Sequence, residues 1–207
     1  MDDAPTPRPR VRLAREDRHR QLIEVAWELV RNEGTDALTL GRLAERAGVA
    51  KPVVYDHFAT RNGLLAALYR DFEARQTQII DAAIEASEPT LPGRAGVIAS
   101  TYVDCVLAQG RELPGVMGAL SSAPELELVK RECEGAFLDK CRRLLAPFAR
   151  EGSVPLHGLR AMLGAAEALS YAALAREITP AQAKAELFDT IVAMVTRPRR
   201  SDPSRFA

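Results

Sequence analysis

The stretch RLAERAGVAKPVVYDHF, residues 42–58, decides how the N-terminal part of the chain folds. It has helical character on both sides, although Gly48 weakens a helix and Pro52 breaks one when it lies inside it. Both residues fit if two helices meet here. Gly48 then supplies the positive φ of a tight turn, and Pro52 lies in the first turn of the second helix, where its missing N–H costs nothing. The stretch therefore predicts a helix-turn-helix.

Helical periodicity continues along the rest of the chain and predicts an all-α fold of about nine helices. Thr39 is expected to cap the helix before the turn, and Gly34 to end the helix before that. Two capping boxes are expected further on, at Ser122 and Glu125 and at Thr179 and Gln182. We expect three short helices to form an N-terminal unit and the others a larger helical domain.

Charge is balanced over the whole chain, with 28 basic and 28 acidic residues, but it is unevenly distributed. Six arginines lie between Arg8 and Arg20, which indicates either contact with a polyanion or a solvated tail. No apolar run approaches the roughly 20 residues that span a bilayer, and the N-terminus lacks a secretory signal. With three cysteines and no CxxC, we expect a cytoplasmic protein with free, mostly buried thiols.

Residues 39–65, TLGRLAERAGVAKPVVYDHFATRNGLL, resemble the DNA-binding signature of the bacterial tetracycline-repressor (TetR) family. The resemblance covers roughly residues 18–68. The features that carry it are Thr39, the Leu43-Ala44 pair, Ala47-Gly48-Val49, Tyr55-x-His57-Phe58, and Arg61 ahead of Leu64-Leu65. It implies a helix-turn-helix DNA-binding domain (16–62) and a ligand-binding and dimerisation domain (63–197). From the residues themselves we expect a flexible basic N-terminal arm (1–15) and a disordered tail (198–207).

A recognition helix presents its N-terminal residues to base edges, while flanking groups hold phosphates. Lys51 is placed to reach a guanine edge or a nearby phosphate, and Pro52 and Val53 to contact a thymine methyl group. The remaining polar side chains are expected to contact phosphates: Thr39, Arg42, Tyr55, His57 and Arg61. For Tyr55 and His57, partial core packing and capping of the helix end are respective alternatives.

Three positions depart from the family's usual pattern. Ala50 stands where many relatives carry a serine that caps the helix and donates to phosphate. Gly63 replaces a common acidic residue, which removes a capping-box partner for Thr60. Asp56 is an unusual charge on a surface that faces DNA, where it can accept from a cytosine amino group or reject certain operators. These departures affect operator choice and leave the class unchanged.

The larger domain is expected to bind an effector and to form a homodimer. Periodicity alone leaves open whether the last two helices close an intramolecular core or pair with a second copy. The resemblance implies dimerisation through residues 156–175 and 180–196. It also implies a pocket for a small-molecule effector. Because the candidate pocket residues are mostly apolar with few charges, we expect a hydrophobic or amphipathic molecule. Candidate pocket residues are Ile98, Tyr102, Cys105, Met117, Phe137, Cys141, Met162 and Tyr171.

We therefore expect a homodimeric, ligand-responsive repressor that binds a palindromic double-stranded DNA operator and has no cofactor, metal or membrane partner. Alternatives are an activator of the same fold and a thiol-redox sensor that uses Cys105, Cys133 or Cys141. No Ser-His-Asp order, phosphate loop or HExxH motif is present, so we expect no enzyme activity.

Overall fold

The computed structural model describes residues 14–109, 112–120, 123–150 and 152–198. Within these ranges the chain forms nine α-helices and two 3₁₀ turns and no strand, which confirms the all-α prediction. In order, the elements are α1 (Arg15–Glu33), η1 (Thr35–Ala37), α2 (Leu40–Ala47), α3 (Lys51–Phe58), α4 (Arg61–Glu85), α5 (Leu91–Gln109), α6 (Glu112–Leu120), α7 (Pro124–Leu145), η2 (Ala146–Phe148), α8 (Leu156–Leu174) and α9 (Pro180–Thr196). None of these helices combines the length and apolarity of a membrane span.

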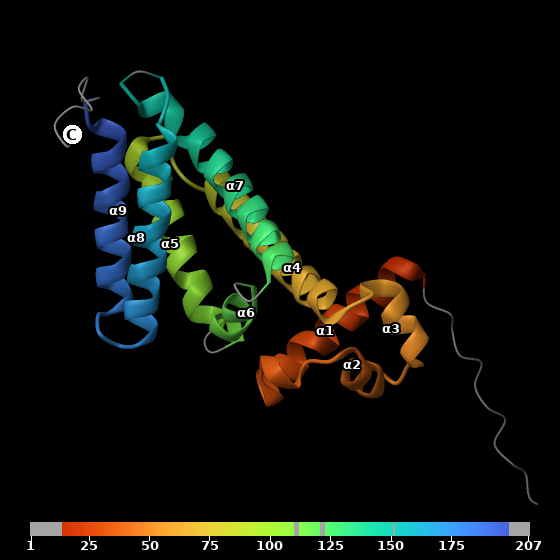
Figure 1. The fold of residues 1–207 in the computed structure, drawn as a ribbon. Helices are drawn as coiled ribbons and strands as arrows, with labels where there is room; N and C mark the ends of the chain where they lie inside the picture. Colours follow the sequence, from red (N-terminus) through yellow and green to blue (C-terminus); the bar gives the residue numbers. More distant parts are fainter. Residues whose placement is uncertain (1–13, 110–111, 121–122, 151, 199–207) are drawn as a thin grey trace, which may run out of the picture. The chain divides into compact units, whose positions relative to one another are not determined.

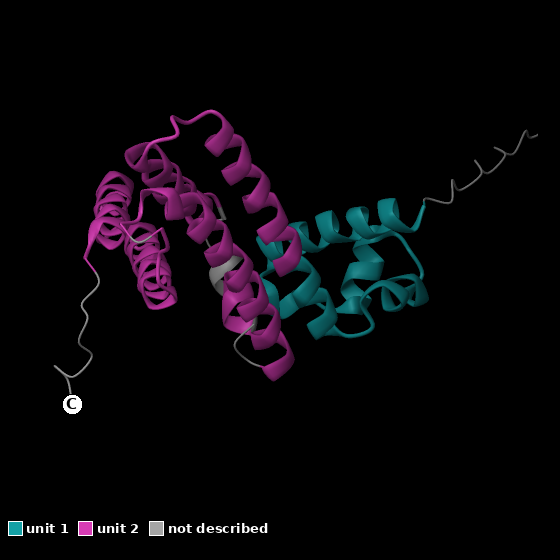
Figure 2. Cartoon of the chain, turned by 90° about the horizontal axis from the view of Figure 1, so that it is seen from above, with its two compact units in different colours: residues 1–68 teal, residues 69–207 magenta. Residues whose placement is uncertain are grey.

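The chain divides into two compact units, residues 1–68 and 69–207, coloured separately in Figure 2. We call them unit 1 and unit 2. The division falls inside α4, so this helix begins in unit 1 and continues into unit 2. Of the predicted basic arm (1–15), residues 1–13 lie outside the described residues, and Arg15 already begins α1. Nearly all of the predicted tail (198–207) also lies outside them.

Unit 1 contains the predicted helix-turn-helix. Gly48 ends α2 in the left-handed region, with φ 65° and ψ 32°. The Val49 N–H donates to the carbonyl of Ala44 at 3.0 Å, which closes the turn as glycine-capped helix ends commonly do. Pro52 lies in the first turn of α3. The two residues that seemed to interrupt a helix therefore mark the end of one helix and the start of the next.

A strained turn just before α4 explains why position 63 is a glycine. Ala59 has φ 56° and ψ −52°, and the Thr60 N–H donates to the Phe58 carbonyl at 2.6 Å, which together form a γ-turn. This turn places the Phe58 oxygen 2.1 Å from the position that a Cβ on Gly63 would take. Thr60 still caps α4, because its hydroxyl accepts from the Gly63 N–H at 3.0 Å. An acidic residue at position 63 would collide with this backbone.

Helices α5, α8 and α9 pack against one another and enclose the core of unit 2 (Figure 1). Helix α9 begins with the predicted capping box, in which Thr179 and Gln182 satisfy each other's backbone N–H groups. Helix α7 begins at Pro124, with Ala123 as its N-cap. Ser122, the predicted cap, lies outside the described residues.

Candidate DNA-binding and ligand-binding sites

Helix α3 has one buried face and one exposed face. Val54 and Phe58 are buried and hold the helix in unit 1. Tyr55 is 51% exposed, and Ala50, Lys51, Pro52 and Asp56 are also exposed, while Val53 is half-buried. The predicted base-reading residues therefore lie at the exposed N-terminal end of the helix. A major groove admits a helix that presents its N-terminal side chains in this way.

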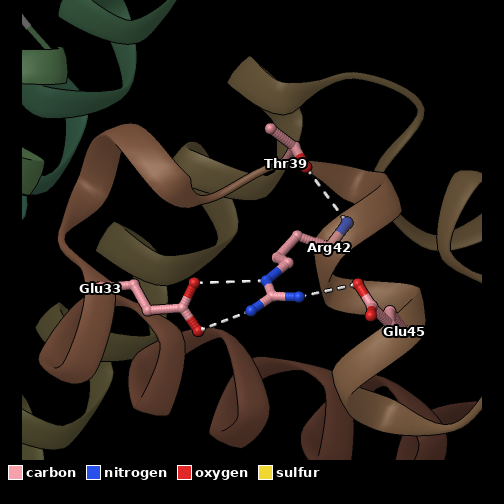
Figure 3. A network of polar contacts seen from close by, with 4 residues as sticks. All are labelled: Glu33, Thr39, Arg42 and Glu45. Carbon is pink, nitrogen blue, oxygen red and sulfur yellow. Dashed lines mark hydrogen bonds and ion pairs between the residues drawn. The ribbon is translucent and has the colours of Figure 1, made fainter.

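Two of the predicted phosphate contacts, Thr39 and Arg42, already have partners within unit 1 (Figure 3). The Thr39 hydroxyl accepts from the Arg42 backbone N–H at 3.1 Å, which leaves its own proton free to donate. The Arg42 guanidinium donates to Glu33 at 3.2 and 3.3 Å and to Glu45 at 2.9 Å. These hydrogen bonds raise the pKa of Arg42, and the bond to Glu33 contributes more than the bond to Glu45. A phosphate would have to compete with both carboxylates for this side chain.

Arg61 has a structural role that the sequence did not indicate. Its Nε donates to the Leu38 carbonyl and its Nη2 to the Thr35 carbonyl, each at 2.8 Å. The side chain therefore ties the first residue of α4 to η1 and to the residue that follows η1. The fork of the guanidinium allows one side chain to satisfy both carbonyls.

His57 is half-buried beside two other rings. Its ring centroid lies 5.6 Å from that of His19 and 6.0 Å from that of Phe58. Burial lowers the pKa of His57, and the neighbouring His19 and Arg15 lower it further. A phosphate contact by His57 at neutral pH therefore relies on one neutral N–H donor more than on an imidazolium charge.

Unit 2 contains a cavity between α4, α5, α6, α7 and α8. The volume of this cavity is about 70 Å³. Its lining residues are Tyr69, Phe72, Glu73, Gln76, Ile80, Thr101, Tyr102, Cys105, Val106, Met117, Glu134, Phe137, Leu163, Glu167 and Tyr171. Five of the residues predicted from the sequence are among them: Tyr102, Cys105, Met117, Phe137 and Tyr171.

The other three predicted pocket residues do not line this cavity. Ile98, Cys141 and Met162 belong to the buried core of unit 2 and are only 1–2% exposed. Helical periodicity identifies the face of a helix that points inward. It does not indicate the level along the helix at which the interior is hollow, and for this reason core and cavity residues were predicted together.

The cavity contains three carboxylates, Glu73, Glu134 and Glu167, none of which was predicted. The Glu73 carboxylate accepts a hydrogen bond from the Tyr69 hydroxyl. Burial raises the pKa of Glu73, and the neighbouring charge of Glu134 adds to this, although the bond from Tyr69 opposes it. The expectation of an apolar pocket with few charges was therefore incomplete.

A signal for Glu73 was present in the sequence. Tyr69, Phe72, Glu73, Gln76 and Ile80 follow one another at helical spacing, so Glu73 falls inside the inward stripe of α4. A carboxylate in such a stripe is unusual, because charged side chains are rarely buried unless they have a partner.

The three cysteines are poor candidates for redox sensing. Burial raises the pKa of Cys133 to about 11 and that of Cys141 to about 12, and it raises the pKa of Cys105 well above its ordinary range. The thiolate is the reactive form of cysteine, so these thiols are largely unreactive at neutral pH. All three thiols are free, but only Cys141 is buried, while Cys105 and Cys133 are half-buried.

Comparison with known proteins supports the identification of unit 1. The profile of the family described as bacterial regulatory proteins, tetR family, matches residues 22–68. The transcriptional activator FasR of Mycolicibacterium smegmatis is 43% identical over 60 residues, which are 28% of this chain and 27% of FasR. The transcriptional regulator BetI of Escherichia coli is 36% identical over 58 residues, which are 28% of this chain and 30% of BetI. The sequence matches thus span less than a third of these curated relatives.

The fold is similar over a much longer part of the chain. A crystal structure described as a putative TetR-family transcriptional regulator from a Rhodococcus species superposes with a TM-score of 0.71. The match covers 87% of this chain and all of the other, at 19% sequence identity, which by itself shows the fold alone. The sequence match and the helix-turn-helix geometry identify unit 1 as the DNA-binding part of a transcriptional regulator. Residues 22–68 therefore form a DNA-binding domain of the tetR family of bacterial regulatory proteins, and the findings together support a TetR-family transcriptional regulator.

Proposed function

We propose that the protein is a homodimeric repressor that binds a palindromic operator and is released from it by a small-molecule effector. The observation that carries the proposal is the exposed N-terminal end of α3, where Lys51 and Pro52 stand free of the core. In this proposal Lys51, Pro52, Val53 and Asp56 read base edges, while Thr39, Tyr55 and His57 hold phosphates. Arg42 and Arg61 contribute to DNA contact mainly by fixing the positions of α2 and α4.

One helix-turn-helix reads few base pairs, whereas a two-fold dimer reads two half-sites about 34–36 Å apart. We place the dimer interface on the outward faces of α8 and α9. Gly164 and Ala168 are exposed there, and their small side chains allow close approach of a second helix. Leu187 and Ile191 cannot belong to the interface, since both are 0% exposed in the core of the chain itself.

Helix α4 offers a physical link between the two activities. Its first residue, Arg61, is bonded within unit 1, and its later residues Tyr69, Phe72 and Glu73 line the cavity. In the proposal an effector binds more tightly to the conformation of the dimer that does not fit the operator. Operator and effector affinities must then decrease each other by the same factor.

Repression rather than activation is proposed as the family's common mode. The similarity to FasR, which is named an activator, lies in the DNA-binding region and does not determine the sign of regulation. A protein of this kind acts in the cytoplasm, where its DNA is, and needs no catalytic residues.

Selection from a random duplex library with the purified full chain tests the proposal. We expect a palindromic consensus whose half-sites are separated by about one helical turn or a multiple of it. A consensus without two-fold symmetry, or no enrichment at all, would overturn the proposed mode of binding. A promoter fusion carrying the selected site then distinguishes repression from activation.

An interface variant tests the dimer. Ala168→Glu places a charge on the proposed interface and should give a monomer by sedimentation, with operator affinity reduced about 100-fold or more. The matched control is Ala136→Glu, which changes an exposed alanine of α7 in the same way and should remain dimeric. If Ala168→Glu also remains dimeric, the interface lies elsewhere.

A further inference from the structure

We propose that the cavity of unit 2 binds an organic cation, in which an ammonium-type group is attached to an aromatic or aliphatic body. This inference rests on the proposed function, because it names the chemical class of the effector. It is argued from the aromatic walls of the cavity and from carboxylates that lack a positive partner.

The walls of the cavity are rich in aromatic rings. Tyr102 and Phe137 lie with ring centroids 5.7 Å apart and tilted, and Tyr69 and Phe72 lie 6.2 Å apart. Tyr171 adds a ring from α8. The faces of such rings attract a desolvated cation, and the interaction grows stronger as water is removed. The same rings give an apolar body a surface to pack against.

The three carboxylates differ in how they are compensated. Glu134 is paired with Arg160 at 2.8 Å and with Lys130 at 3.4 Å. Among the described residues neither Glu73 nor Glu167 forms an ion pair, and the Tyr69 hydroxyl is the hydrogen-bond partner of Glu73. Both side chains are half-buried. A carboxylate that is partly removed from water without a positive partner costs free energy, and a cation in the cavity would supply that partner.

Other classes of ligand fit this cavity less well. An anion would face three carboxylates, and a neutral apolar ligand would remove the remaining water from Glu73 and Glu167 without replacing its hydrogen bonds. Within the described part of the chain no group of His, Cys, Asp or Glu side chains is arranged to hold a metal ion. These observations together select an organic cation.

Binding should also depend on pH in a definite direction. Burial raises the pKa of Glu73, and a cation beside this carboxylate would lower it. Cation binding must then release a proton from the fraction of molecules in which Glu73 is protonated. The affinity therefore rises as pH increases through the raised pKa of Glu73, and Glu73→Gln should remove that part of the dependence.

Calorimetric titration of the full chain with three ligands of similar shape tests the inference. Phenyltrimethylammonium, tert-butylbenzene and benzenesulfonate carry a positive, a neutral and a negative head group on the same ring. We expect the cation to bind at least about tenfold more tightly than the neutral compound, and the anion not to bind.

Glu73→Gln should reduce affinity for the cation about tenfold or more and leave affinity for tert-butylbenzene unchanged or raised. Glu132→Gln is the matched control, since it makes the same change at an exposed residue of α7 that does not line the cavity. It should bind the cation as the unmodified chain does. Thermal unfolding of both variants establishes that they are folded, and Glu167→Gln provides a second variant of the site.

Equal binding of the three compounds, no binding of the cation, or an unchanged cation affinity in Glu73→Gln would each overturn the inference. The proposed function is tested separately, by selection of an operator in the absence of ligand. A chain that selects a palindrome but ignores the cation leaves the regulator proposal standing and removes only the effector class. A chain that binds the cation but selects no DNA site would overturn the regulator proposal and leave the cation site standing.

Discussion

Units 1 and 2 differ in where the charged side chains of their candidate sites lie. In unit 1 the predicted site faces outward, with Lys51 and Asp56 exposed and Arg42 held between Glu33 and Glu45. In unit 2 carboxylates face inward, into a cavity among aromatic rings, and Glu73 lacks a positive partner among the described residues. An exposed charge costs the folded protein little free energy. A charge that is removed from water without a partner costs more, so its presence points to a function. The outward charges suit a polyanion and the inward ones suit a cation.

The largest expected effect concerns Arg61, a charged side chain of unit 1 that forms partly buried hydrogen bonds to two backbone carbonyls. Arg61→Ala leaves the carbonyls of Thr35 and Leu38 without their charged donor, so we expect the free energy of unfolding to fall by roughly 3 kcal/mol. Arg61→Lys should recover only part of the loss, because an ammonium cannot span both carbonyls as the fork does. Urea unfolding of both variants measures this. Equal stability of Arg61→Ala and the unmodified chain would show that the anchor has no role.

The next effect concerns the exposed face of α3. Lys51→Ala should reduce discrimination at one base position of the selected operator by about 2 kcal/mol, because a base contact is lost. Tyr55→Phe should weaken binding to all sequences more evenly, since a phosphate contact carries no sequence information. Anisotropy titrations against the operator and single-base variants compare the two. If both variants change affinity in the same pattern, the division into reading and holding residues is wrong.

A smaller effect is expected at the start of α4. Gly63→Ala brings a Cβ against the Phe58 carbonyl, so the unfolding free energy should fall by about 1 kcal/mol despite the better helix propensity of alanine. Gly96→Ala in α5 is the matched change with no heavy atom within 4 Å of the added Cβ. It should be stabilising by up to about 1 kcal/mol. Two shifts of the same sign in thermal unfolding would contradict this account of the γ-turn.

The smallest expected effect is on the thermal stability of the protein without a ligand in its cavity. Because burial raises the pKa of Glu73, the folded state binds this proton more readily than the unfolded state, and the stability that this group contributes falls as pH rises through that pKa. Glu73→Gln should therefore raise the Tm at pH 8 by about 2 °C and have little effect near pH 4. A lower Tm at pH 8 would indicate that the ionised Glu73 is well compensated in the empty protein.

The helix-turn-helix could be predicted because its signals are local. Gly48, Pro52 and the cap at Thr39 each act within one turn of chain, and the structure confirms all three. The bonds of Arg61 to Thr35 and Leu38 could not be predicted in this way, because they join residues 23 and 26 positions apart. The cavity forms where five helices meet, so the sequence predicted three of its five aromatic residues but neither its depth nor its carboxylates.

Reciprocal coupling tests most directly whether the outward and inward sites belong to one switch. Phenyltrimethylammonium affinity is measured by calorimetry for the free protein and for its complex with the selected operator, and operator affinity is measured with and without the cation. The account predicts that operator and cation weaken each other by the same factor, about fivefold or more, and that Glu73→Gln abolishes the effect. Equal cation affinity in the free and the DNA-bound protein would contradict it.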